Sequence, residues 1–178
     1  MPQRAIVHSV EEKVLETIER TLHLVALVPA NRLEWRPESP ANLPAGNDLG
    51  HLLGHLLDCL AGFCAALYAA FPAELADLGD LRSLPVNQFC EAEEAQTKMK
   101  LYIAAIERGF RSCADADLAR RIQTVFTPEG ETLMTILLGN LEHLINHKYQ
   151  LFFYLKLAGV PVVSRDLYKW RGDAEPGR

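Results

Sequence analysis

Residues 133–157 read LMTILLGNLEHLINHKYQLFFYLKL, the stretch of the chain that is most informative about its architecture. It is apolar except near its centre and has the length and spacing of a buried helix. His143 and His147 lie four residues apart within it, so a helix places them on nearly the same face, one turn apart. Two imidazoles held this way in an apolar stretch are either ordinary core residues or half of a metal site.

A second histidine pair with the same spacing, His51 and His55, lies in the other strongly apolar stretch, residues 49–71. Asn47 or Asp48 is expected to cap this helix, which ends before a proline. Because positions i and i+4 differ by only about 40° around a helix axis, both histidines can face inward. The spacing therefore leaves two alternatives open, a site of three histidines and a site of four.

Two amphipathic helices complete the pattern. The first is expected to begin at Ser9, where Ser9 and Glu12 match a capping box, and to end before Pro29. The other follows residues 85–88 and carries an apolar stripe at helical spacing. This stripe consists of Ala92, Ala95, Met99, Tyr102, Ile106 and Phe110.

Four helices joined by connections of uneven length predict an all-α fold, a four-helix bundle. The last helix is expected to span Glu131–Ala158 and to end at Gly159. Residues 29–47 hold four prolines and predict a long, structured entry loop to the second helix. Residues 1–178 are expected to form one domain with a frayed tail over 171–178. Bundles build metal sites from side chains on facing helices, as two histidine pairs would allow.

Composition excludes several classes of function. The net charge is −5 and basic residues are scattered, so nucleic acid is not an expected partner. No signal peptide is apparent, and the apolar residues 49–71 fit a central bundle helix better than a membrane span. The four cysteines show no C-x-x-C motif, which predicts reduced, buried thiols in a cytoplasmic protein. No phosphate-binding loop, dinucleotide motif or serine-hydrolase motif occurs.

Three strings resemble motifs of the DinB/YfiT-like superfamily. Residues 48–58, DLGHLLGHLLD, are similar to its second-helix motif. Residues 142–150, EHLINHKYQ, with the apolar run that follows, resemble its fourth-helix motif, H-x-x-x-H-x-x-Q. Residues 33–37, LEWRP, are similar to its entry into the second helix. Asn146 departs from the pattern, because many members have a histidine there.

The resemblance implies a DinB-like bundle in which His55, His143 and His147 bind one divalent metal ion, zinc or nickel, while His51 is no ligand. Members of the superfamily include thiol-dependent transferases and isomerases, and homodimers are common. The chain is therefore expected to be a metal-dependent thiol transferase or hydrolase acting on a small molecule. The alternative is a non-catalytic stress-response protein that binds a metal or a small ligand.

Other polar residues near the histidines are candidates for supporting roles, and no catalytic residue is assigned. Three imidazoles leave a coordination position open, which is typical of catalytic rather than structural sites. A fourth protein ligand would close the site, and Cys59 is one candidate for it, beside Asp58 and His51. The candidates for contacts to a ligand histidine or to substrate are Asp58, Asn140, Gln150 and His51.

Overall fold

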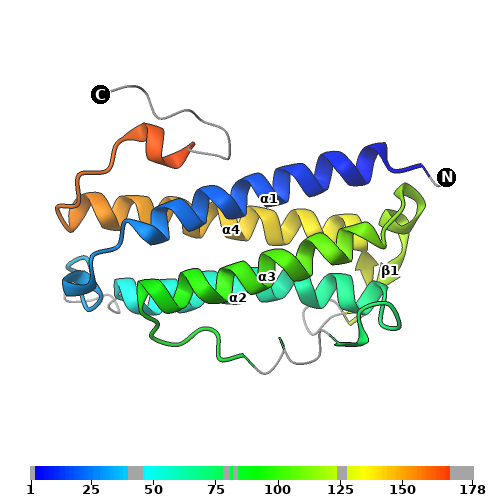
Figure 1. The fold of residues 1–178 in the computed structure, drawn as a ribbon, viewed down its shortest axis with the longest axis horizontal. Helices are drawn as coiled ribbons and strands as arrows, with labels where there is room; N and C mark the ends of the chain where they lie inside the picture. Colours follow the sequence, from blue (N-terminus) through cyan, green and yellow to red (C-terminus); the bar gives the residue numbers. More distant parts are fainter. Residues whose placement is uncertain (1–2, 40–45, 78–80, 82–83, 124–127, 169–178) are drawn as a thin grey trace.

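The computed structural model is an elongated bundle of α-helices (Figure 1). It describes residues 3–39, 46–77, 81, 84–123 and 128–168. The long helices are α1 (Ala5–Ala26), α2 (Leu49–Ala70), α3 (Ala92–Arg111) and α4 (Leu133–Leu157). Between and after them lie short 3-10 helices and one two-stranded ladder, η1 (Ala30–Arg32), η3 (Asp115–Ala119), β1 (Arg121–Ile122), β2 (Glu131–Thr132) and η4 (Ser164–Leu167). The predicted all-α four-helix bundle is confirmed.

The helix directions follow from one long crossing connection (Figure 1). The α2 and α3 helices run parallel, and the described parts of this connection are residues 71–77, 81 and 84–91. Residues 71–77 follow the end of α2, and residues 84–91 lead along α2 to the start of α3. The α1 and α4 helices run in the opposite direction. Each helix packs against two others, and α2 packs against both α3 and α4. The two helices that carry histidine pairs are therefore neighbours.

The start of α1 corrects the capping-box prediction. The helix begins at Ala5, and the hydroxyl of Ser9 donates to the carbonyl of Ala5 instead of capping the helix. Two backbone amides of the first turn, which have no partner within the helix, are satisfied by the first residue of η3. Asp115 Oδ1 accepts hydrogen bonds from the amides of Ile6 and Val7 at 3.0 and 2.9 Å. A carboxylate at a helix N-terminus stabilises the helix as a local cap would.

The ends of α2 and α4 largely follow the predicted signals. The side chain of Asp48 accepts from the amide of His51, and Gly159 follows α4 with φ 82°, a left-handed conformation that favours glycine. The start of α4 differs from the prediction, because Glu131 and Thr132 pair with β1. Thr132 therefore caps the helix, accepting from the amide of Thr135 at 3.2 Å.

The crossing connection lies directly on α2 because two glycines leave room for it. The amides of Asn87 and Cys90 donate to the carbonyls of Gly54 and Gly50 at 2.8 and 3.0 Å. A Cβ atom at Gly54 would lie 1.7 Å from the carbonyl oxygen of Gln88, and one at Gly50 would meet the ring of Phe89. Asn87 itself has φ 56°, which asparagine tolerates better than most residues. This close approach brings a side chain of the connection to the face of α2 that carries His55.

The α2 helix is the apolar centre of the core. It is long and apolar enough to cross a membrane by length and composition, yet 61% of its most apolar window is buried within the bundle. Burial against α3 and α4 accounts for its composition, as expected of a core helix. All four cysteines are free and buried, as the sequence predicts.

Candidate metal centre

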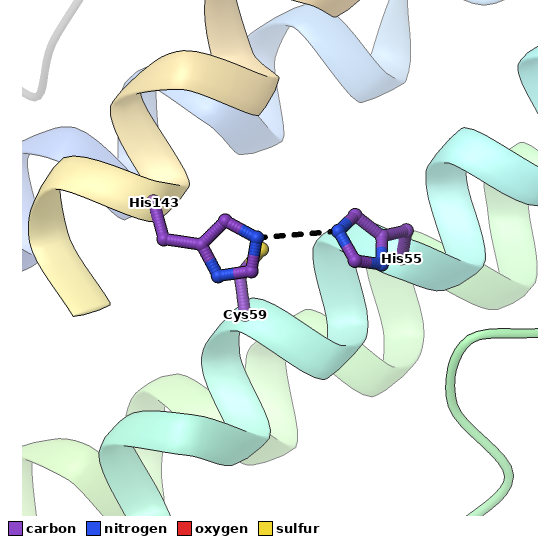
Figure 2. Close-up of side chains that lie close together, drawn as sticks. All are labelled: His55, Cys59 and His143. Carbon is purple, nitrogen blue, oxygen red and sulfur yellow. Dashed lines mark hydrogen bonds between the residues drawn. The ribbon is translucent and has the colours of Figure 1, made fainter. Parts of the chain in front are cut away.

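Three histidine side chains meet between α2 and α4. The Nε2 atom of His55 lies 3.0 Å from Nε2 of His147 and 3.3 Å from Nε2 of His143. His143 and His147 stand side by side on α4 with ring centroids 4.7 Å apart. Figure 2 shows His55 and His143 facing one another across the gap between the helices. The cluster lies at the edge of the bundle, with His143 exposed and the other two rings half-buried.

In His55 and His147, an amide side chain determines which ring nitrogen carries the proton. His55 Nδ1 lies 3.0 Å from Asn87 Oδ1, and His147 Nδ1 lies 2.8 Å from Gln150 Oε1. An amide oxygen only accepts hydrogen bonds, so each Nδ1–H donates and each Nε2 of a neutral ring keeps its lone pair. Two lone pairs facing each other at 3.0 Å repel unless a cation lies between them.

The separations between the nitrogens suit one metal ion. Two imidazole nitrogens bound to one ion at about 2.0–2.1 Å in tetrahedral geometry lie roughly 3.3 Å apart, and at a right angle roughly 2.9 Å apart. The measured 3.3 and 3.0 Å span this range. Nδ1–H groups that donate to oxygen acceptors are also the usual arrangement behind metal-bound histidines. The donor set therefore fits a divalent ion, although the assignment of the three ligands stays a prediction.

Cys59 brings a possible fourth donor to the cluster. Its sulfur and ring nitrogens of His55 and His143 all lie within 4.8 Å of one another, as Figure 2 illustrates. Cys59 follows His55 by one turn of α2 and approaches from the buried side. Burial, helped by the nearby charge of Asp58, raises the pKa of the Cys59 thiol to about 12. The free thiol is thus neutral near pH 7 and would have to lose its proton to bind a metal.

A hydrogen-bonded chain ties the cluster to the entry loop of α2. Gln150, which accepts from His147, donates through its Nε2 to the hydroxyl of Tyr154 at 3.1 Å. The Tyr154 ring packs edge-on against Trp35 with centroids 5.7 Å apart. Gln150 therefore contacts His147 directly, and metal binding by His147 stays a prediction. This ring contact holds Trp35 of the entry loop against α4.

The other candidate residues lie away from the nitrogen cluster. His51 binds the Asp48 carboxylate through Nδ1 at 2.9 Å and packs its ring against Phe89. Asn140 lies against Gly62 where α4 approaches α2. Asp58 lines a pocket on the side of α2 that faces α3. The geometry therefore favours three histidines over four, and Asn87 rather than Asp58 contacts His55.

Asn87 is the residue beside the cluster that the sequence alone does not predict. It lies in an irregular connection, 32 positions after its histidine partner. Neither periodicity nor motif spacing connects such positions. The sequence feature that indicates such a contact is the glycine pair Gly50 and Gly54, which marks a face of α2 where another chain segment comes close.

Fold and site together define a four-helix bundle with a histidine cluster between two facing helices. The crystal structure of a DinB-like protein, YjoA from Bacillus subtilis, has the same fold, with a TM-score of 0.64 over 87% of this chain and 95% of that one. The two sequences are 16% identical. No family model and no curated protein matches the sequence. The DinB-like fold predicted from the motifs is thus confirmed.

Proposed function

We propose that the protein binds one divalent metal ion, zinc or nickel, through His55, His143 and His147. The observation that carries the proposal is the convergence of three Nε2 atoms, two of them held in the lone-pair form by Asn87 and Gln150. Imidazole suits both metals. His143 and His147, one turn apart on α4, would also bind the ion with little loss of side-chain freedom, because the helix backbone already places both rings side by side.

We further propose that the centre serves a metal-dependent thiol transferase or hydrolase. A bound divalent ion would supply Lewis acidity there, which favours the ionised form of a thiol or of water. The exposure of His143 supports access for a small substrate such as a low-molecular-weight thiol. Asn87 and Gln150 would hold the His55 and His147 rings in orientation, with each Nε2 directed at the bound ion. The net charge of −5 with scattered basic residues supports a protein without nucleic acid partners. The four free, buried thiols support a cytoplasmic location, and the burial of α2 within the bundle supports a protein without a membrane partner.

One observation favours the alternative, a non-catalytic metal-binding protein. The Cys59 sulfur lies close enough to the cluster to become a fourth protein ligand. Four protein ligands on a tetrahedral ion leave no position for substrate, which is typical of structural sites. The two functions therefore differ in the role of a single side chain.

Replacing Cys59 by alanine distinguishes the two functions. If Cys59 is not a ligand and the metal has an open coordination position, Cys59→Ala should still bind one metal ion per chain. The variant should also still transfer a small thiol to an electrophile. Elemental analysis and thiol titration measure these quantities, with Cys64→Ala on the same helix as the matched control. Cobalt(II) loading adds a spectroscopic test, because thiolate ligation gives a sulfur-to-metal charge-transfer band. Such a band in the parent protein, lost in Cys59→Ala, would establish the closed site instead.

Metal affinity should depend on pH through the histidines. Burial lowers the pKa of His147 from its ordinary value of 6.5, opposed by its hydrogen bond to Gln150 and aided by the other two rings. A lowered pKa keeps the ring neutral, so binding should persist slightly below pH 6.5 and then weaken as protons compete. Equilibrium dialysis from about pH 8 to about pH 4 measures this. Metal retained undiminished at the acidic end would contradict a histidine-only site.

We also propose that the protein is a homodimer, on the basis of the family resemblance and of exposed apolar side chains on α4. Phe153 and Leu157, one turn apart, are 56% and 65% exposed. Contiguous exposed apolar side chains are typical of contact surfaces. Light scattering should give twice the chain mass for the parent protein and the chain mass for the double variant Phe153→Glu, Leu157→Glu. Leu101→Glu, on α3 and 50% exposed, is the control that should stay dimeric. A monomeric parent protein would overturn the proposal.

A further inference from the structure

A second feature with the properties of a binding site lies on the other side of α2. It is a pocket of about 260 Å³ bordered by α2, α3 and the crossing connection. None of the three clustered histidines lines it. Its described walls are mostly apolar or aromatic and include Ala61, Tyr68, Leu81, Val86 and Tyr102. The pocket is therefore a separate site from the metal centre.

One carboxylate interrupts this apolar wall. Asp58 lines the pocket half-buried, and no side chain or amide of the described residues donates a hydrogen bond to it or forms an ion pair with it. The negative charge of Asp58 makes it harder for a neighbouring side chain to lose a proton. Burial first, and then the charges of Cys64 and Asp58, raise the pKa of Tyr102 to about 12. A carboxylate in apolar surroundings gains most from a cation that brings its own apolar surface.

The remaining walls indicate the kind of cation. Aromatic side chains attract organic ammonium groups as well as apolar bodies. Drug-sized ligands occupy pockets of roughly 300–1,000 Å³, so about 260 Å³ suits a smaller molecule. Burial raises the pKa of the Cys64 thiol to about 12, which leaves it protonated and unreactive near neutral pH. The pocket is thus equipped to bind a ligand without forming a covalent bond to it.

We propose that this pocket binds a small organic ammonium ion, with the ammonium group on the Asp58 carboxylate and an aromatic or aliphatic body between Tyr68 and Tyr102. The carboxylate supplies charge selectivity and the apolar walls supply affinity. This site is independent of the proposed metal function, because its lining and the histidine cluster share no residue.

The test uses two probes of nearly equal shape and different charge, 2-phenylethylammonium and 2-phenylethanol. Titration followed by NMR of the full-length protein should show saturable shifts for the cation and at least about tenfold weaker binding of the alcohol. Asp58→Asn should reduce cation binding to the level of the alcohol. Ala61→Leu, which fills the pocket with apolar atoms, should remove the binding of both probes.

Two control variants separate this site from general charge effects and from the metal centre. Glu93→Gln removes an exposed carboxylate on α3, and His55→Ala removes a member of the histidine cluster. Both should bind 2-phenylethylammonium as the parent protein does, while circular dichroism verifies that each variant is folded. Absence of saturable cation binding, equal affinity for the two probes, or full binding by a folded Asp58→Asn variant would each overturn the proposal.

Discussion

Replacement of His55, His143 or His147 by alanine, one at a time, is expected to lower metal affinity by more than about 100-fold. Loss of a residue that only orients a ligand costs about 10–100-fold, so loss of the ligand itself should cost more. Each variant also leaves two nitrogens, too few to hold a divalent ion that prefers at least four donors. Elemental analysis after dialysis, followed by competition with a chelator, measures the effect.

The same helices offer a graded set of controls. His51→Ala removes a histidine one turn from His55 that is bound to Asp48, so it should leave affinity unchanged. Asn87→Ala and Gln150→Ala should give intermediate losses of about 10–100-fold, because each frees a ring from its fixed orientation. Full metal content in all three ligand variants would contradict the assignment. A large loss in His51→Ala would instead favour the four-histidine alternative.

The parts of the fold that the sequence predicts correctly depend on local rules. Helical periodicity located all four helices, and Asp48 and Gly159 mark helix ends through contacts within a few residues. The i,i+4 spacing put His143 and His147 on one face without knowledge of any partner. Their approach to His55 requires only that α2 and α4 be neighbours, and each helix of this bundle packs against two of the other three.

The parts that could not be predicted depend on contacts between distant positions. Asp115 caps α1 across more than a hundred residues, so the local capping signal at Ser9 was misleading. Asn87 reaches His55 only because the crossing connection turns back along α2. Asp58 and Cys59 face different surroundings because adjacent positions lie about 100° apart around a helix axis. Asp58 therefore lines the pocket between α2 and α3, whereas Cys59 lies beside the histidine cluster.

Replacement of Gly54 by alanine is expected to lower the free energy of unfolding substantially. In most helices this change stabilises by up to about 1 kcal/mol, because alanine is the better helix former. Here the new Cβ atom would lie 1.7 Å from the backbone oxygen of Gln88, far inside any allowed contact. The crossing connection must then move, which breaks the hydrogen bond from the Asn87 amide to the Gly54 carbonyl. We expect a net loss of about 2 kcal/mol or more in the free energy of unfolding.

Two further glycines calibrate this measurement. Gly139 lies on α4 with nothing within 4 Å of its added Cβ atom, so Gly139→Ala should stabilise the protein slightly. A Cβ atom added at Gly50 would clash with the ring of Phe89, but this side chain lies at the protein surface and can rotate away. Gly50→Ala should therefore fall between the other two. Chemical denaturation gives all three values, and equal stability of Gly54→Ala and Gly139→Ala would show that the connection does not press on α2.

Gly54→Ala should also weaken metal binding, although Gly54 offers no ligand atom. Movement of the connection takes Asn87 away from His55 Nδ1, so the ring can rotate or change the nitrogen that carries its proton. The expected loss of affinity matches that of Asn87→Ala, about 10–100-fold, and the double variant should lose little more than either single one. Additive losses would mean that the glycine acts on the site by another route. Non-additive losses would identify the crossing connection as the part of the fold that orients His55.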